Sequence, residues 1–356
     1  MTDLGPSTIS GSTRDFTVVR RATIEDVAGL SGLSTATVSR VFASSETSTI
    51  VTPSTRRKVM SAAQRVGYQP HWIARAFAAG RTNLVGLLYQ GNVPILDSIY
   101  RDMVATFSDA LRARGYHLMF IPVVENESYW RQMLNAGAVD ACVALEMIDG
   151  AMFDAIRESA LPAVLLNAGD QYDLSRVMVD DRAAAQMLTE HLLRLGHRRI
   201  LFYVSENAHA GHYSIDWRRE GFFDAMRAQG IAPEELFFQG TPEAMHERVL
   251  RSRDFSAVIC YSHMEVLPLL QFVARHGVKV PGQLSIASFN DVYPMQFTIP
   301  PLTTMSIPGS DIGAVGAELL LEQLDARIAR PVRVRPEITR RVLACRLVQR
   351  ESTGQV

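Results

Sequence analysis

Residues 23–42 read TIEDVAGLSGLSTATVSRVF, and this stretch predicts two short helices joined by a tight turn. Thr23 can cap the first helix, and the charges that follow it are negative, as the first turn of a helix favours. Gly32 falls where the chain has to reverse, and Ser34 can cap the second helix. Apolar residues recur at three- and four-residue spacings, so each helix has one apolar face. These positions are Ile24, Val27, Ala28, Val38 and Val41.

The other face of the second helix carries short polar groups and one arginine. Its residues are Thr35, Ala36, Thr37, Ser39 and Arg40. Such a surface suits the floor of a DNA major groove, where small side chains fit and a guanidinium can bind a base edge. An ordinary helical hairpin in a globular core is the alternative. The small residues Ala28 and Gly32, which let the helices cross closely, favour DNA binding.

The charge of the chain is unevenly divided. The whole chain has a net charge of −1, but residues 21–81 hold eight basic and three acidic side chains, a net charge of +5. Residues 1–20 balance, so the remainder carries −6. A basic module on an acidic body is consistent with polyanion binding at one end only, although a solvated basic face has the same composition.

Length and cysteine content limit the class of protein. A chain of 356 residues with 47% hydrophobic residues is too long for one ordinary core, so two or three domains are expected. Cys142, Cys260 and Cys345 lie far apart in apolar surroundings without metal-ligand spacing, which predicts buried, reduced thiols in a cytosolic protein. Neither a membrane span nor a secretory signal is recognisable, and residues 1–20 are expected to be a disordered tail.

Residues 21–69 are predicted to form a small three-helix domain. Thr52 and Pro53 can start the third helix and Gly67 can stop it. Residues 70–82 are then a linker with a helical run of about nine residues, too short to be stable alone in water. We therefore expect a hinge that orders conditionally.

From residue 84 onward apolar strands alternate with amphipathic helices, which predicts an α/β body with doubly wound parallel sheets. The candidate strands are 84–89, 117–123, 141–145, 163–167, 199–204, 256–261 and 284–289, with a further element near 338–348. Two lobes are expected within residues 83–353. The first comprises about 83–177 and 304–337, and the second about 178–303 and 338–353. Ligands of such folds bind outside the carboxyl ends of the strands, here also between the lobes.

No catalytic constellation is recognisable in this body. Walker, GxSxG and HExxH patterns are absent from the sequence. His191 and His197 flank a helix end and are interpreted as surface or capping residues in preference to metal ligands. The sequence therefore predicts neither an enzyme nor a bound metal or cofactor.

Several ordered motifs together resemble the LacI–GalR family of bacterial transcription regulators. They include the opening stretch, VTPSTRRKVMSAAQRVGYQP, IARAFAAGRTNLVGLL, MVDDRAAAQMLTEHLLRLGHRRI, WRREGFFDAM, GVKVPGQLSIASFND, IPPLTTM and RLVQRESTG, and cover about residues 22–353. The resemblance implies a helix-turn-helix headpiece, a hinge helix and a two-lobed body like periplasmic sugar-binding proteins. It also implies a cytoplasmic, nucleoid-associated homodimer on a near-palindromic operator.

The resemblance assigns DNA contacts to named positions. Bases are read from Thr35, Ala36, Ser39 and Arg40, with Thr37 on the same face, and phosphate contacts fall to Thr23, Ser34 and Thr55. The hinge helix of the family enters the minor groove, and its DNA contacts are assigned to Ile73, Ala74 and Phe77. Phe77 stands where relatives usually have a leucine wedge. It either parts a base step or packs against its symmetry mate or the body.

The effector set implied by the resemblance departs most from the family pattern. Asp97 can cap the first body helix, Tyr100 can line the pocket, and Arg218 matches the arginine of the RxxG motif. Asn167, His263 and Asn290 stand where sugar-binding relatives frequently place acids, which lowers the negative charge near the ligand. We therefore expect an effector that is anionic or rich in acceptors, such as a sugar acid or phosphorylated sugar, held by the cationic Arg218 with His263 helping. A neutral sugar with different hydrogen bonding is the alternative.

The resulting hypothesis is a ligand-responsive DNA-binding regulator, a repressor of carbohydrate or related catabolic genes. Closure of the lobes on the effector would change the spacing of the two hinge helices in a dimer. Because the sequence shows no added heptad segment, we expect a dimer and not a tetramer. The competing classes are a sugar-binding transport protein without a role on DNA and a metabolic enzyme with a similar sheet.

Overall fold

The computed structural model describes residues 20–43, 51–69, 80–90, 98–124, 128–146, 149–206, 208, 212–251, 255–329 and 337–356, with only the backbone of residues 43, 98 and 99. Contacts divide the chain into two units, Met1–Thr82 and Asn83–Val356. Each unit is considered by itself. The predicted tail (1–19), the short helical run of the linker (71–79) and Asp97 lie outside the described residues.

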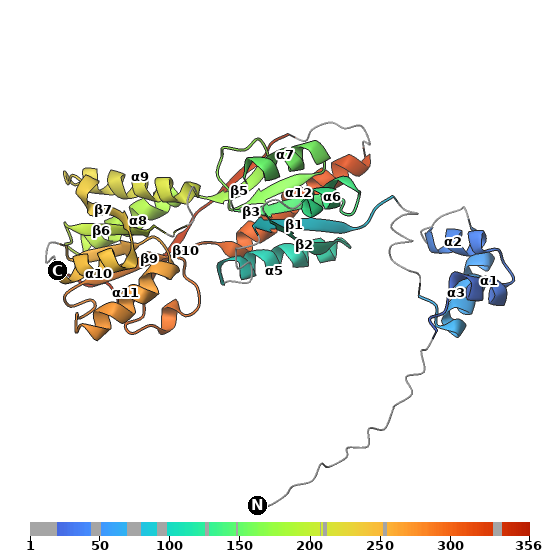
Figure 1. Ribbon diagram of the computed structural model, residues 1–356, viewed down its shortest axis with the longest axis horizontal. Helices are drawn as coiled ribbons and strands as arrows, with labels where there is room; N and C mark the ends of the chain where they lie inside the picture. The colour runs from blue at the N-terminus through green and yellow to red at the C-terminus, as the bar shows by residue number, and fades with distance from the viewer. Residues whose placement is uncertain are drawn as a thin grey trace, which may run out of the picture. The chain divides into compact units, whose positions relative to one another are not determined.

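The described part of the first unit forms the three predicted helices (Figure 1). They are α1 (Ile24–Ser31), α2 (Thr35–Ala43) and α3 (Pro53–Val66). Thr23 and Asp26 form a reciprocal capping box at the start of α1, and Gly32 ends it in the left-handed conformation that glycine adopts without strain. Small apolar side chains, among them Val27, Val38 and Val59, fill the core between the helices.

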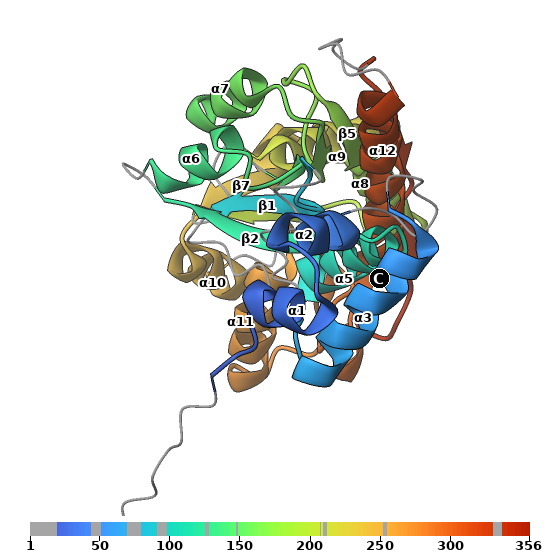
Figure 2. The ribbon, with the colours of Figure 1, turned by 90° about the vertical axis from the view of Figure 1, so that its right-hand side faces the viewer.

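The second unit contains two six-stranded sheets, one in each lobe (Figure 1). In the first lobe the order is β11-β5-β4-β3-β1-β2, and all neighbours are parallel. The strands are β1 (Leu84–Gln90), β2 (His117–Val123), β3 (Ala141–Leu145), β4 (Ala163–Leu166), β5 (Ser175–Val179) and β11 (Arg340–Leu343). Its helices are α5 (Ser98–Ala113), α6 (Tyr129–Asn135), α7 (Gly150–Ser159) and α12 (Gly309–Ala329). α6 and α7 pack side by side (Figure 2), and α12 packs against α5.

The second sheet has the order β12-β10-β9-β8-β6-β7, and β12 alone runs antiparallel to its neighbour. The strands are β6 (Ile200–Ser205), β7 (Phe237–Gly240), β8 (Ala257–Cys260), β9 (Ser285–Phe289), β10 (Thr303–Ser306) and β12 (Arg346–Val348). The helices are α8 (Asp181–Arg194), α9 (Tyr213–Arg227), α10 (Pro242–Arg251) and α11 (His263–Arg275), with short 3₁₀ turns η1 (Glu234–Leu236) and η2 (Met295–Phe297). The α/β class and the two doubly wound lobes are as predicted.

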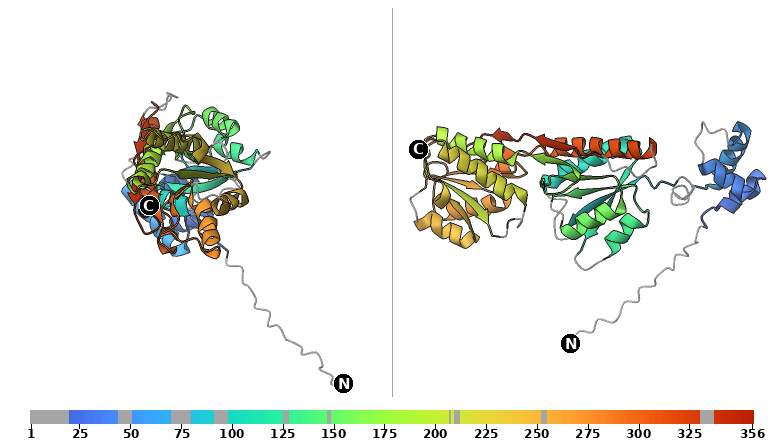
Figure 3. Two further views of the ribbon diagram at one scale, coloured as in Figure 1. Left: turned by 90° about the vertical axis from the view of Figure 1, so that its left-hand side faces the viewer. Right: turned by 90° about the horizontal axis from the view of Figure 1, so that it is seen from above.

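The chain passes between the lobes three times, after β5, after β10 and between β11 and β12 (Figure 3). Three predicted lobe limits differ from this pairing. Residues 178 and 179, predicted in the second lobe, belong to β5 in the first sheet. Residues 304–306 belong to β10, which pairs with β9 in the second sheet, and residues 340–343 belong to β11, which pairs with β5 in the first. Apart from Thr339, the run from 338 to 348 consists of apolar and basic residues, so its pattern does not show that it is two strands in different sheets.

Close helix packing depends on two glycines. A Cβ on Gly221 of α9 would lie 2.0 Å from the backbone oxygen of Arg182 in α8. A Cβ on Gly313 of α12 would lie 2.2 Å from the backbone oxygen of Met103 in α5. Both helix pairs are therefore closer than any side chain at these positions would allow.

The buried thiols are as predicted, but the two histidines are not at the surface. Cys142, Cys260 and Cys345 are free and buried. His191 and His197 are buried as well, because both hold the C-terminal segment: His191 Nε2 lies 3.0 Å from Thr353 Oγ1, and His197 Nε2 lies 3.1 Å from the Gly354 carbonyl oxygen. Their role is structural, and burial lowers the pKa of both.

Candidate functional site

The exposed face of α2 is the first candidate site. Thr35, Ala36, Ser39 and Arg40 are exposed and Thr37 is half-buried, whereas Val38 of the same helix is buried in the core of the unit. The helical period separates the two faces in the way that the sequence predicts. The face offers short polar groups with one guanidinium, a combination that fits the base edges of a major groove.

Three residues predicted to contact phosphate lie at the starts of helices. Thr23 caps α1, the amide of Thr37 donates to Ser34 Oγ at the start of α2, and the amide of Thr55 donates to Thr52 Oγ1 in the first turn of α3. Helix N-termini attract anions because their free amides and dipole point outward. The remaining predicted DNA contacts, Ile73, Ala74 and Phe77, lie outside the described residues.

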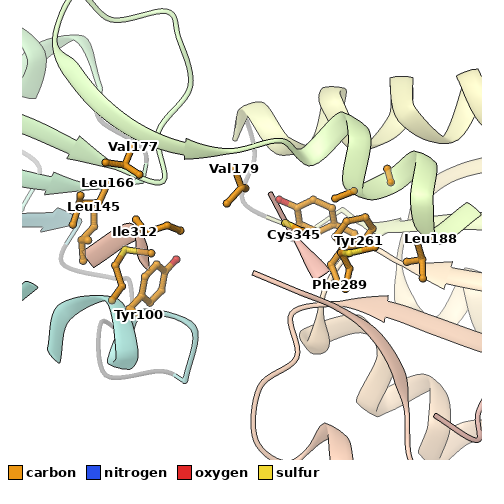
Figure 4. Close-up of a cluster of buried hydrophobic side chains, with 14 of the residues drawn as sticks. Tyr100, Leu145, Leu166, Val177, Val179, Leu188, Tyr261, Phe289, Ile312 and Cys345 are labelled. Atoms are coloured by element: carbon orange, nitrogen blue, oxygen red, sulfur yellow. The ribbon is translucent and has the colours of Figure 1, made fainter. Parts of the chain in front are cut away.

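The second candidate site is a cavity of about 360 Å³ in the second unit. It is lined from both lobes, and five of the six predicted effector residues take part. These are Tyr100, Asn167, Arg218, His263 and Asn290. Figure 4 shows Tyr100 packed beside Leu145, Leu166 and Ile312 of the first lobe. The carboxyl ends of parallel strands meet at one edge of a sheet, so residues that are far apart in the sequence lie together at this cavity.

Three lining residues share an uncommon backbone conformation. Glu146, Asn167 and Asn290 directly follow β3, β4 and β9, and their φ angles are +54°, +55° and +69°. Each amide still pairs with the neighbouring strand, for example Asn290 N with Met305 O at 2.9 Å. Left-handed backbone is unfavourable outside glycine and is retained where the surroundings enforce it, often at functional sites. At the end of each of these three strands, the left-handed backbone directs a polar side chain into the cavity.

A polar network links these residues across the lobes. Asn167 Nδ2 donates to Glu146 Oε1 at 3.1 Å, and the hydroxyl of Tyr213 on α9 donates to Asn167 Oδ1 at 3.3 Å. Asn290 Nδ2 lies 3.3 Å from His263 Nδ1. Among the residues that the structure describes, Asn290 Oδ1 is buried without a hydrogen-bond partner, so it is an acceptor available to a ligand.

Arg218 lines the cavity but is not a free cation. Its Nε donates to Asp181 Oδ1 at 2.7 Å and its Nη1 to the carbonyl of Tyr261 at 2.7 Å. The guanidinium carbon also lies 4.1 Å from the ring centre of Phe289. Burial opposes its charge, but the attraction of Asp181 prevails and raises the pKa of Arg218. The charge with which this arginine is expected to attract an anion is therefore balanced by the buried carboxylate of Asp181.

Sequence reasoning missed two acids of the lining, Glu146 and Glu265. Glu146 follows a buried strand directly, which is the same signal that identified Asn167. Glu265 lies in the first turn of α11, where Ser262 Oγ donates to its carboxylate, so the S-x-x-E capping pattern could have located it. The charged lining groups among the described residues are thus Arg218, paired with Asp181, and two glutamates.

Neutral hydrogen-bonding groups complete the lining. Ser214 Oγ lies 2.7 Å from both His212 Nδ1 and the hydroxyl of Tyr261. Burial raises the pKa of Tyr203 and of Tyr261 to about 12, so both phenols stay protonated. Within the described ranges no cluster of three His, Cys, Asp or Glu side chains could hold a metal ion. No helix in the described part of the chain is both long and apolar enough to cross a membrane.

Two known families match successive parts of the chain. Residues 23–71 match the bacterial regulatory proteins of the lacI family, and residues 189–353 match the periplasmic binding protein-like domain. The HTH-type transcriptional regulator GalR of Escherichia coli is 32% identical over 345 residues, which are 94% of this chain and 96% of that protein. The regulator CelR of Thermobifida fusca is 27% identical over 355 residues, 94% of this chain and 98% of CelR.

Solved structures agree with these matches. The complex of the transcriptional regulator CelR with cellobiose has a TM-score of 0.66 at 26% identity and aligns with 93% of this chain and 100% of its own. The lac repressor dimer bound to operator and the anti-inducer ONPF has a TM-score of 0.77 at 20% identity, covering 94% of this chain and 100% of its own. At that identity the second likeness concerns the fold alone.

Proposed function

The chain belongs to the lacI family of bacterial regulatory proteins, and we propose that it is a repressor whose affinity for operator DNA depends on a small-molecule effector. The observation that carries the proposal is the exposed face of α2, with Arg40 among short polar side chains above a buried apolar face. Arg40 is the group best suited to a guanine edge, and Thr35, Ala36, Thr37 and Ser39 complete the reading surface. The relatives are regulators and not enzymes.

Phosphate contacts are assigned to Thr23, Ser34 and Thr55, because each lies at the N-terminal end of a helix, where the helix dipole attracts a phosphate. Ile73, Ala74 and Phe77 are proposed to follow into the minor groove, with Phe77 as the wedge. Such a regulator acts where the chromosome is, in the bacterial cytoplasm.

A homodimer on a near-palindromic operator is proposed, and an exposed apolar patch on the second unit supports it. Tyr293, Phe297 and Ile299 follow β9 and are 68%, 65% and 95% exposed, and the first two rings lie 5.5 Å apart at their centres. Large apolar side chains gathered at one exposed place are typical of a protein interface. A two-fold partner would bury the patch and place two headpieces for two half-sites.

The effector is proposed to be a neutral sugar. Arg218 is neutralised by Asp181, and Glu146 and Glu265 add negative charge to the lining, so an anion would be repelled. Carboxylate and amide oxygens, including Asn290 Oδ1, are suitable acceptors for sugar hydroxyls. The CelR complex contains the neutral sugar cellobiose, which supports the same class. A sugar acid or phosphorylated sugar is therefore the less favoured choice.

The proposed coupling runs through the two lobes. A sugar that contacts Asn167 in one lobe and Asn290 in the other binds a particular arrangement of the lobes best, and so shifts the population toward it. In a dimer that shift changes the spacing of the two linkers. Coupling energies of this kind are about 1–3 kcal/mol, and the effect of sugar on DNA affinity equals that of DNA on sugar affinity.

Isothermal titration of the full chain with neutral monosaccharides and with the corresponding uronic acids and sugar phosphates tests the effector. We expect the neutral members to bind more tightly. Tighter binding of the charged members would reject the neutral effector. Sugar binding combined with equal retention of all DNA sequences would favour a sugar-binding protein without a role on DNA.

A further inference from the structure

Side-chain contacts join the two lobes in addition to the three crossings of the chain. In the second lobe they come from the first two turns of α9, which begins at Tyr213. In the first lobe they come from residues 167–170, which follow β4, and from β11. Both partners of each contact belong to the chain, so these contacts act on the arrangement of the lobes whether or not an effector is bound.

The first contact is a hydrogen bond across the boundary between the lobes. The hydroxyl of Tyr213 donates to Asn167 Oδ1 at 3.3 Å. Removal of water from this hydroxyl, together with the negative charge of Asp181, raises the pKa of Tyr213, so the phenol keeps its proton and remains a donor. Asn167 Nδ2 in turn donates to Glu146 in the first lobe. The side chain of Asn167 is thus held by both lobes at once.

The second contact is a close approach at Gly169. A Cβ on Gly169 would lie 2.8 Å from Cβ of Tyr213, closer than real Cβ atoms come to another heavy atom. The Cβ of Tyr213 is attached directly to the backbone of α9, so it cannot move away unless the helix moves. The absence of a side chain at position 169 therefore lets α9 touch the first lobe directly.

Trp217 lies one turn after Tyr213 on the same face of α9 and extends the contact. The two rings meet edge to face with centres 5.9 Å apart, and the guanidinium carbon of Arg340 on β11 lies 6.0 Å from the centre of the Trp217 ring. Arg340 also lies 3.7 Å from the carboxylate of Asp170. A cation over an indole ring contributes a modest attraction, so this contact supports the first two.

We propose that Tyr213 is a positioning residue of the sugar response and forms, with Gly169 and Trp217, an interlobe latch. The latch stabilises the described arrangement of the lobes and acts through Asn167, which the proposed sugar also contacts. The inference rests on the proposed coupling between the lobes and the operator, and it assigns that coupling to named contacts. Loss of the hydrogen bond should raise the population of other arrangements about 2- to 12-fold, which corresponds to about 0.5–1.5 kcal/mol.

The distance between two spin labels tests the latch in the full-length protein, without sugar or DNA. The labels are attached at Glu158→Cys on α7 and at Gln229→Cys after α9, both exposed positions. Cys142, Cys260 and Cys345 are buried and do not compete for the label. Labelled protein is diluted with unlabelled protein, so that the distances measured are those within one chain.

Two variants disturb the latch in different ways. Tyr213→Phe removes the hydrogen bond and keeps the ring, whereas Gly169→Ala inserts a methyl group between the lobes. Both should shift part of the distance distribution away from that of the parent protein. The controls are Tyr129→Phe, at an exposed position of α6, and Gly150→Ala, whose added Cβ meets nothing within 4 Å, and both should leave the distribution unchanged. The parent distribution in both Tyr213→Phe and Gly169→Ala would overturn the latch.

Operator affinity is a readout that a merely structural role of Tyr213 would not move. Tyr213 lies in the second unit, outside the exposed face of α2, so it reaches the operator only through the arrangement of the lobes. Without sugar, Tyr213→Phe should change the operator affinity by up to about 12-fold. With saturating sugar the affinity should equal that of the parent, because the sugar then determines the arrangement. The same change with and without sugar would reject a role in positioning.

Failure of the latch and failure of the proposed function give different results. If the distances shift but the operator affinity responds neither to sugar nor to Tyr213→Phe, the latch exists and the proposed coupling is wrong. If the distances stay as in the parent while sugar changes the operator affinity, only the latch is wrong.

Discussion

Arg218 of α9 and Asp181 of α8 form a buried ion pair, with 2.7 Å between Nε and Oδ1 and side chains that are 5% and 1% exposed. The pair has two consequences. It removes the cationic character that the arginine would otherwise give the cavity, and it fixes the guanidinium against Phe289 and Tyr261. The arginine therefore shapes the cavity wall and supplies no net charge to it.

Removing one member of this pair should destabilise the second unit severely. Arg218→Met leaves Asp181 charged and buried, which typically costs about 3–5 kcal/mol of unfolding free energy. Urea unfolding followed by circular dichroism measures the loss. The matched control is Arg219→Met on the same helix, whose partner Asp216 is solvent-exposed, and it should cost less than about 1 kcal/mol. The double variant Arg218→Met/Asp181→Leu should recover much of the loss. Equal unfolding free energies of Arg218→Met and Arg219→Met would contradict the stabilising role of the buried ion pair.

The close packing of α8 and α9 gives a second prediction. Gly221→Ala places a methyl group 2.0 Å from a backbone oxygen that cannot move without shifting α8, so we expect a loss of at least about 1–3 kcal/mol. Gly150→Ala, at the start of α7, meets nothing within 4 Å and should leave the unfolding free energy nearly unchanged. Thermal or urea unfolding of the two variants compares them directly. A stable Gly221→Ala protein would show that the helices are further apart than described.

The buried histidines predict a pH dependence of stability. Burial lowers the pKa of His197 in the folded protein below the value near 6.5 of the unfolded chain, so protonation favours unfolding. The stability contributed by the neutral ring is fully present above about pH 6.5 and is lost as the pH falls through that value and the lowered folded pKa. The slope is at most about 1.4 kcal/mol per pH unit for each such histidine.

Urea unfolding between pH 7.5 and 5.0 measures this slope. His197→Gln should show a shallower decline than the parent protein, with a residual slope from His191, whose pKa is also lowered. His117→Gln in the exposed position of β2 serves as the control. A parallel decline in His197→Gln and the parent would assign the pH dependence to other groups.

Two substitutions separate base reading from phosphate contact. Arg40→Ala on the exposed face of α2 should cost about 1–3 kcal/mol on the operator and relax specificity at one base pair. Lys58→Ala removes an exposed positive charge from α3, so it should weaken binding to all sequences alike and reduce the salt slope by about one. Fluorescence anisotropy on operator and scrambled duplexes at several salt concentrations distinguishes the two. If Arg40→Ala weakens binding to both duplexes equally, Arg40 does not read a base.

The sequence predicted those elements whose pattern is local. The caps and apolar stripes of α1 and α2, and all seven candidate apolar strands, are where their patterns indicate. The sequence pattern does not predict β5, β7 or β10. β5 begins with the polar residues Ser175 and Arg176, and β7 has half-exposed side chains at the sheet edge. Thr303 and Thr304 interrupt the apolar character of β10. The division of 340–348 into two strands depends on which sheet each half joins, and no local pattern encodes that.

The candidate site shows the same limit. Asn167, His263 and Asn290 were identifiable because parallel strands bring their carboxyl ends together. The ion pair of Arg218 was not identifiable, because its partner Asp181 precedes it by 37 residues on another helix and only tertiary packing brings the two together. The charge of the cavity, and with it the class of effector, therefore depends on a contact that the chain spacing does not reveal.

The measurement that tests the account most directly is the affinity of the full-length protein for DNA flanking its own gene, with and without the sugar that calorimetry identifies. We expect selective retention of one fragment over scrambled DNA. Saturating sugar should change the operator affinity by about 5- to 150-fold, and operator should change the sugar affinity by the same factor. Equal affinity for operator and scrambled DNA, or an operator affinity that the sugar leaves unchanged, would contradict the account.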